Sequence, residues 1–173
     1  MTQRAQTDSR HSARLRLDGS GEATAETGLP VLDHLLEVLA ASGRFDLTLE
    51  LAPDDADAEV IAAGRALGEA LHGLLRADGA RGHAAAAMPA DEALAHVVLE
   101  ASGRPLVASN VDLTEARVGG LGTDLAARFL GALAESAGLT LHVRLIDGDD
   151  TQHVLEAIFK ALGVALAQAC RPA

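Results

Sequence analysis

The sequence predicts an α+β fold: an internal duplication of a ββαβα unit, with helices on one face of mainly antiparallel sheets. Three observations support this prediction. Short segments alternate apolar and polar residues as strands do, longer segments repeat apolar residues at helical spacing, and both kinds follow the same order in the two halves. We expect residues 1–81 to form the first half-repeat and residues 82–173 the second, joined in one compact structural unit.

Sequence similarity between the halves supports the duplication. Two helices rich in alanine and leucine can resemble one another by chance, but chance does not readily place three similar blocks in matching order. We therefore favour a repeated unit over coincidence. The three blocks are residues 15–21 with 98–103, residues 47–51 with 139–143, and residues 64–71 with 159–166.

In the first half, alternation in residues 13–17 followed by a Gly-containing turn predicts a strand. A helix is predicted where leucines recur at helical spacing, and Pro30 is tolerated in its first turn. The predicted elements are strands at 13–17 and 24–27, a helix at 29–41, a strand at 45–51, and a helix from 54 to about 75.

The second half repeats this scheme after a polar, Gly-containing connector at residues 78–82. Leu125, Phe129, Leu130 and Leu133 are spaced to face one side of a helix. The predicted elements are strands at 93–100 and 106–111, a helix at 123–136, a strand at 139–145, and a helix at 151–169.

Composition indicates a globular protein, because hydrophobic residues make up 49% of the 173 residues and charged residues 23%. Aromatic residues are only 2%, so contacts between subunits could add buried area that the core lacks. A formal net charge of −11 disfavours nucleic acid as a partner. No apolar run is long enough for a membrane helix, and we expect no membrane partner. The polar N-terminal segment and the single cysteine, Cys170, favour the cytoplasm.

Four residues are candidates for metal chemistry. His153 and Glu156 lie three positions apart in the last predicted helix, so both side chains share one face near its N-terminus and could bind one divalent cation. A solvated helix surface is the commoner explanation for such a pair. His142 lies in an otherwise apolar strand and His34 lies among leucines. Each alone is more often a hydrogen-bonded core histidine, but together they bring imidazoles from three elements.

Five segments resemble motifs of the imidazoleglycerol-phosphate dehydratase family, in order and across nearly the whole chain. Residues 27–36 resemble the motif T-G-x-x-F-x-D-H-M-L, and residues 152–162 resemble H-H-x-x-E-A-x-F-K-A-L. The other three are residues 89–95, which resemble P-M-D-E-A-L-A, residues 102–105, which match S-G-R-P, and residues 139–142, which resemble I-T-L-H.

The resemblance implies two fused halves of the ribosomal protein S5 domain 2-like fold, and removal of water from imidazoleglycerol phosphate in histidine biosynthesis. It further implies a pair of Mn²⁺ ions at subunit boundaries and a homo-oligomer, a trimer-based shell of up to 24 chains. Carried over residue by residue, His153 and Glu156 become catalytic residues, while Arg104, Lys160 and Asp8 would bind the phosphorylated imidazole substrate or a related anion. The implied metal ligands are His34, His142, His153 and Glu156.

Several ligand positions of the family pattern are substituted here. Alignment of the repeated helices places the first H-H-x-x-E motif on Asp57, Ala58 and Ile61, and neither alanine nor isoleucine can bind a metal. In the second motif Gln152 replaces the first histidine, and Ser42 stands where another histidine is expected. The residues that remain furnish at most one depleted site. Mn²⁺ is the expected cofactor if that site survives; the alternative is no cofactor.

Three hypotheses follow from the sequence. The favoured one is a dehydratase-like protein with a depleted metal site and weak or no activity, acting as a homo-oligomer or as a hetero-oligomer with an active paralogue. The alternative is an active metal-dependent dehydratase, a carbon–oxygen lyase, in which Asp57 helps to complete a rearranged site. A third, nucleic-acid binding, rests only on other uses of the fold, and the net charge opposes it.

Overall fold

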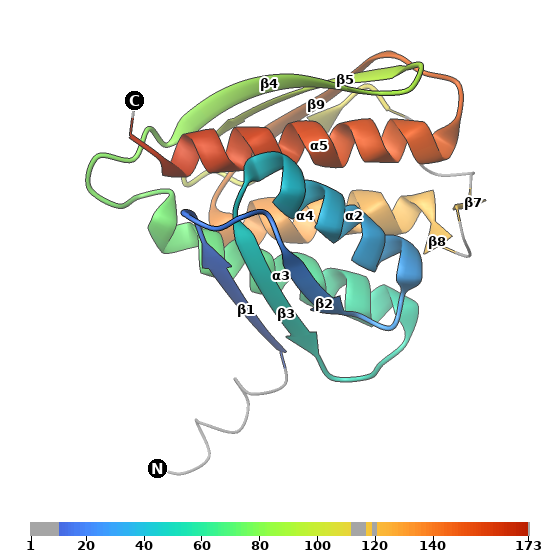
Figure 1. Ribbon diagram of the computed structural model, residues 1–173, viewed down its shortest axis with the longest axis horizontal. Coiled ribbons are helices and arrows are strands. Elements are labelled where there is room, and N and C mark those ends of the chain that lie inside the picture. The colour runs from blue at the N-terminus through green and yellow to red at the C-terminus, as the bar shows by residue number, and fades with distance from the viewer. Residues whose placement is uncertain (1–10, 112–116, 119–120, 173) are drawn as a thin grey trace.

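The computed structural model describes residues 11–111, 117–118 and 121–172. In this part of the chain, helices from both halves pack together in a central layer, and a β-sheet covers the layer on each side (Figure 1). Strands whose apolar residues all point to one side need such a cover, since one face of each sheet must be buried. The protein is therefore an α+β protein, as the sequence predicts.

The first half contributes one three-stranded sheet and two helices. The central strand pairs antiparallel with one neighbour and parallel with the other. All five elements coincide with the predicted ones to within a few residues. They are β1 (His11–Arg16), β2 (Ala23–Glu26), α2 (Pro30–Gly43), β3 (Asp46–Leu51) and α3 (Ala56–Leu74), and the sheet order is β1-β3-β2.

The second half contributes a four-stranded sheet, a short hairpin and two helices. Its sheet order is β4-β5-β9-β6, in which β6 runs parallel to β9 and the other pairs are antiparallel. The elements are β4 (His83–Ala90), β5 (Ala93–Glu100), β6 (Leu106–Ser109), β7 (Arg117–Val118), β8 (Leu121–Gly122), α4 (Thr123–Ala137), β9 (Thr140–Asp147) and α5 (Thr151–Cys170).

The duplication is visible in the sheet topology. The order β1-β3-β2 of the first half recurs as β5-β9-β6 in the second, with the same antiparallel and parallel neighbours. The helices also exchange partners symmetrically, because α3 packs on α4 and α2 packs on α5. The two larger sheets are mixed, and antiparallel pairing predominates in both, as predicted.

One strand departs from the predicted scheme. β4 pairs with β5 along its whole length, although residues 83–90 were not predicted as a strand. The reason is compositional: its sequence HAAAAMPA is rich in alanine, which has low strand propensity, and contains Pro89. Proline is tolerated because β4 lies at the edge of the sheet. The neighbouring strand supplies the order that the local sequence does not.

Two glycines allow the helices to approach closely. A Cβ atom on Gly68 of α3 would lie 2.6 Å from the Cβ of Ser136 in α4, and one on Gly163 of α5 would overlap the carbonyl oxygen of Leu39 in α2. The halves therefore meet through helix pairs whose backbones nearly touch. This contact places the N-terminal turn of α5 beside α2.

By length and composition alone, α5 is long and apolar enough to span a membrane, although the sequence predicted no such helix. Within its apolar window, however, 72% is buried inside the protein. It packs against α2, β4 and β5 and contributes Phe159, which stacks at a tilt on Phe129 of α4. The hydropathy of α5 is thus accounted for by its central place in the core.

Candidate metal and anion site

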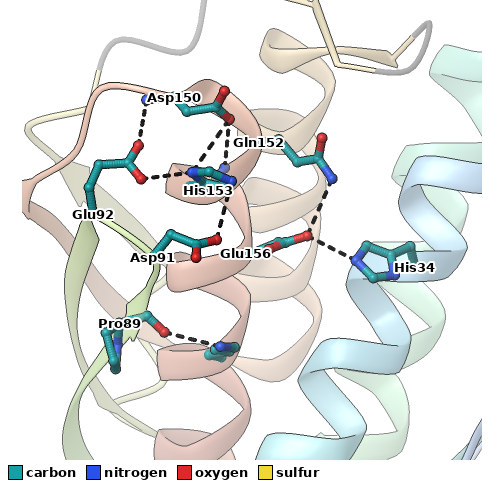
Figure 2. A network of polar contacts seen from close by, with 9 residues as sticks. His34, Pro89, Asp91, Glu92, Asp150, Gln152, His153 and Glu156 are labelled. Atoms are coloured by element: carbon teal, nitrogen blue, oxygen red, sulfur yellow. Dashed lines mark hydrogen bonds and ion pairs between the residues drawn. The ribbon is translucent and has the colours of Figure 1, made fainter.

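The N-terminal turn of α5 carries the first group of predicted site residues. The Asp150 carboxylate caps this helix by accepting a hydrogen bond of 3.1 Å from the backbone N–H of His153. Because α2 lies alongside, His34 Nε2 comes within 3.0 Å of Glu156 Oε1, and the Gln152 amide donates to the same oxygen at 3.4 Å (Figure 2). The fold thus joins His34 and Glu156, which are 122 positions apart in the sequence.

His153 faces a different set of partners. Its Nδ1 lies 2.7 Å from Glu92 Oε2, and its Nε2 lies 3.2 Å from Asp91 Oδ2, so both ring nitrogens contact carboxylates (Figure 2). Both acids come from the tight turn between β4 and β5, where Asp91 has a φ of 52°. Aspartate is among the few residues other than glycine that adopt this left-handed conformation readily, so Asp91 suits the tight turn.

Asp91 and Glu92 had no role in the sequence interpretation, although both lie in a quoted motif. The only local signal was a pair of adjacent carboxylates between two strand-like segments. Their closeness to His153 depends on how α5 packs across the β4–β5 hairpin, which local sequence does not reveal. A second contact strengthens the same junction, since Glu92 Oε1 accepts a 2.9 Å hydrogen bond from the backbone N–H of Asp150.

The carboxylates where α5 meets the β4–β5 turn favour the protonated form of the His153 imidazole. The hydrogen bond from the Asp150 N–H, followed by that from His153, lowers the pKa of Glu92 from 4.5 to about 2. Glu92 in turn raises the pKa of His153 above its ordinary 6.5. A doubly protonated ring donates from both nitrogens and has no lone pair for a metal ion. His153 therefore binds a metal only after losing a proton and leaving one of its carboxylate partners.

The His34–Glu156 pair fits one side of a divalent ion. An imidazole nitrogen and a carboxylate oxygen are suitable donors, while the neutral amide of Gln152 is a weaker one. Such ions take about four to six donor atoms. Among the residues that the structure describes, no three His, Cys, Asp or Glu side chains are grouped to hold a metal. One chain therefore supplies an incomplete ligand set at the contact between α2 and α5.

His142 lies apart from the other predicted ligands within this chain. It is exposed on β9, whereas its neighbours Leu141 and Val143 are buried against the helices. The sheet thus separates His142 from His34 and Glu156, and a single chain does not bring the proposed ligands together. The apolar surroundings expected for both histidines are also absent, because the side chain of His34 is 51% exposed. His142 instead helps to line a surface cavity of about 450 Å³ together with Arg81, His83, Glu100 and Thr140.

The two cations predicted to bind phosphate lie at opposite ends of one hairpin. Lys160 Nζ donates to the carbonyl of Pro89, which faces Leu94 at the start of β5. Arg104 follows the far end of β5, where its carbonyl accepts a hydrogen bond from Thr140. Six strand residues separate these ends, a distance of about 20 Å. One chain therefore cannot clamp a single phosphate with both side chains, and Asp8 lies outside the described residues.

The corresponding turn of the first half holds no ligand set. Asp55 caps α3 there, with its carboxylate accepting from the N–H of Ala58, as Asp150 caps α5. Asp57, which the alternative hypothesis used to complete a rearranged site, pairs with Arg128 of α4 instead. The structure therefore keeps Asp57 apart from the His34–Glu156 pair.

A family model for imidazoleglycerol-phosphate dehydratase matches residues 27–166, which include α2, most of α5 and every described contact of the His34–Glu156 pair. The chain belongs to the imidazoleglycerol-phosphate dehydratase family. A curated imidazoleglycerol-phosphate dehydratase from Pelobacter propionicus is 39% identical, in an alignment covering 98% of this chain and 89% of that protein. One from Syntrophobacter fumaroxidans is 42% identical, covering 98% and 88%.

Solved structures of imidazoleglycerol-phosphate dehydratase also share the fold. The enzyme from Staphylococcus aureus is similar with a TM-score of 0.86 and 30% identity, and the alignment covers 95% of each chain. The enzyme from Pyrococcus furiosus, solved in complex with (S)-C348, gives 0.82 and 28%, covering 94% of this chain and 89% of that one. The duplicated architecture that the family resemblance implied is therefore confirmed.

Proposed function

We propose that this chain is an imidazoleglycerol-phosphate dehydratase-like protein of histidine biosynthesis, located in the cytoplasm, whose depleted metal site gives weak or no dehydratase activity. One observation carries the proposal. The contact between α2 and α5 joins His34 to Glu156, while His153 is held by carboxylates of the β4–β5 turn, and the equivalent start of α3 carries no such pair. Loss of a single outer-shell partner at a metal site already lowers affinity or activity about 10- to 100-fold. Loss of direct ligands in both halves is more severe.

The test is metal content and turnover measured on one purified sample. After saturation with Mn²⁺ and removal of free metal, we expect fewer than one ion per chain. Turnover of imidazoleglycerol phosphate should be at least about 100-fold below that of the Pelobacter propionicus enzyme assayed beside it. Two tightly held ions per chain with turnover equal to that enzyme would contradict the proposal.

A rearranged active site is the second candidate, and the surroundings of His153 favour it. Asp91 and Glu92 could serve as oxygen ligands once His153 gives up a proton, since carboxylates suit Mn²⁺. On this alternative, Asp91→Asn and Glu92→Gln each lower bound Mn²⁺ and activity together. On the favoured proposal, neither substitution changes an activity that is already weak or absent.

Assembly belongs to the same proposal. An incomplete ligand set and two phosphate-binding cations about 20 Å apart support a site shared between subunits. The subunits would be identical copies in a trimer-based shell of up to 24 chains, or this chain with an active paralogue. A phosphorylated imidazole or related anion would then contact Arg104 of one chain and Lys160 of the next. Mass measurement of the purified protein, alone and co-expressed with a paralogue, separates the two assemblies.

A further inference from the structure

The capped helix ends relate the two halves residue by residue. Asp55 and Asp150 cap the starts of α3 and α5 in the same way. Arg44 and Gly138, both with positive φ, follow the ends of α2 and α4. Counting from these caps, Arg128 of α4 takes the position that His34 holds in α2. By the same count, Asp57, Ala58, Ile61 and Arg65 of α3 take the positions of Gln152, His153, Glu156 and Lys160 in α5.

The α3–α4 contact therefore has an ion pair where the α2–α5 contact has His34 and Glu156. The guanidinium of Arg128 bonds the Asp57 carboxylate across the α3–α4 contact and lies 4.0 Å from Asp124 of its own helix. Ala58 and Ile61 add no donor atom. Ala58 and Ile61 instead line a surface cavity of about 520 Å³ that neither Asp57 nor Arg128 borders. The α3–α4 contact therefore lacks metal ligands and holds a guanidinium, paired with carboxylates, in the position of the His34 imidazole.

We propose that Arg128 acts as a built-in cation that bridges α3 to α4 through Asp57 and excludes a divalent metal from the α3–α4 contact. This inference rests on the proposed depleted site and makes it asymmetric, since only the α2–α5 contact could then accept an ion. A guanidinium has five N–H donors and no lone pair, so it cannot become a ligand. Its charge also repels an incoming divalent cation, and exposed ion pairs of this kind contribute little to stability. Exclusion of metal is therefore the effect that distinguishes Arg128 from an ordinary surface residue.

The test introduces the missing metal ligands into α3, in variants that keep Arg128 and in variants that replace it. In the whole chain, the triple substitution Asp57→His, Ala58→His and Ile61→Glu is made first with Arg128 kept, then combined with Arg128→Gln, which removes the charge, and with Arg128→His. Mn²⁺ binding is measured by calorimetry, and circular dichroism and thermal melting show whether each variant is folded. We expect no additional ion with Arg128 present. One additional ion per chain should bind in both the Arg128→Gln and the Arg128→His combinations.

Other outcomes overturn the inference. An additional ion in the triple variant that keeps Arg128 means that the guanidinium does not exclude metal. Absence of an additional ion in the folded Arg128→His combination means that the first-half position is not equivalent to a metal site. Either result leaves the proposed function standing, because that proposal depends on the metal content and turnover of the unsubstituted chain.

Discussion

Arg76 and Arg171 occupy equivalent positions after the second helix of each half, and each guanidinium donates to carbonyl groups that end a helix of the other half. Arg76 bonds the carbonyls of Ala137 and Gly138 at 2.9 and 3.1 Å. Arg171 bonds those of Gly43 and Arg44, both at 3.2 Å. The last carbonyls of a helix have no partner within it and carry partial negative charge, so a guanidinium satisfies both needs.

The first prediction concerns the hydrogen bonds that Arg171 donates to these carbonyls. Arg171→Ala removes three hydrogen bonds, including one of 2.7 Å to the Leu17 carbonyl. It should lower the free energy of unfolding by about 1–3 kcal/mol, because charged donors to carbonyls contribute more than neutral ones. Urea unfolding measures the loss. Arg65→Ala, which removes an exposed arginine of α3, is the control and should change stability by less than about 0.5 kcal/mol. Equal losses of unfolding free energy in both variants would show that the hydrogen bonds of Arg171 stabilise the protein no more than an exposed arginine does.

The second prediction concerns Gly163. A methyl group there would overlap the Leu39 carbonyl, so Gly163→Ala should destabilise the protein by about 1–3 kcal/mol despite the better helix propensity of alanine. Gly131 of α4 is the matched control, since a Cβ there meets nothing within 4 Å. Gly131→Ala should stabilise by about 0.5–1 kcal/mol. Thermal melting of the two variants should therefore shift in opposite directions, and a shared direction would contradict the close helix contact.

The sequence predicts most of this fold because the responsible patterns are local. Helical spacing of leucines locates α2, and alternation locates β3 and β9. Alternation also predicts that His142 is exposed. Leu141 and Val143 share the buried face of β9, so a histidine between them faces outward. The expectation that it sits in an apolar environment considered the composition of the strand and overlooked its period. β4 was missed for the opposite reason, since its alanines carry too weak a pattern.

The site is less predictable because its contacts join distant segments. Family motifs point to His34, His153 and Glu156, but only the packing of α2 on α5 shows that His34 meets Glu156 while His153 turns to Asp91 and Glu92. A motif lists side chains without their partners. For that reason the sequence assigned His153 and Glu156 to one ion, whereas the structure gives them separate neighbours.

The third prediction restores one ligand in the second half. Gln152 lies one turn before Glu156 and donates to its Oε1 at 3.4 Å, so Gln152→His places an imidazole beside the His34–Glu156 pair. Because imidazole is a better ligand than an amide, Mn²⁺ affinity should rise at least about tenfold. Calorimetric titration measures the affinity, with Gln152→Ala as the control for loss of the amide. Equal affinities in the two variants would mean that the side chain at position 152 is not a metal ligand.

The fourth prediction is a pH dependence at the junction of α5 with the β4–β5 turn. Because Glu92 raises the pKa of His153, the pair stabilises the fold fully below 6.5 and loses this contribution as pH rises through the raised value. Because the pKa of Glu92 is lowered to about 2, its contribution is complete above 4.5 and disappears as pH falls toward 2. The pair should therefore stabilise most between these two ordinary values.

Titration of the His153 ring by NMR tests directly whether Glu92 raises the pKa of His153. Glu92→Gln keeps the shape of the side chain and removes its charge, so the pKa of His153 should fall toward 6.5 and the stability maximum between pH 4.5 and 6.5 should flatten. Glu100→Gln, at the far end of β5, should leave the pKa of His153 unchanged and serves as the control. If the pKa of His153 stays the same in Glu92→Gln, the short contact between their side chains does not set the charge of this imidazole. In that case the contact with Glu92 would not make protons compete more strongly with a metal ion for the His153 imidazole.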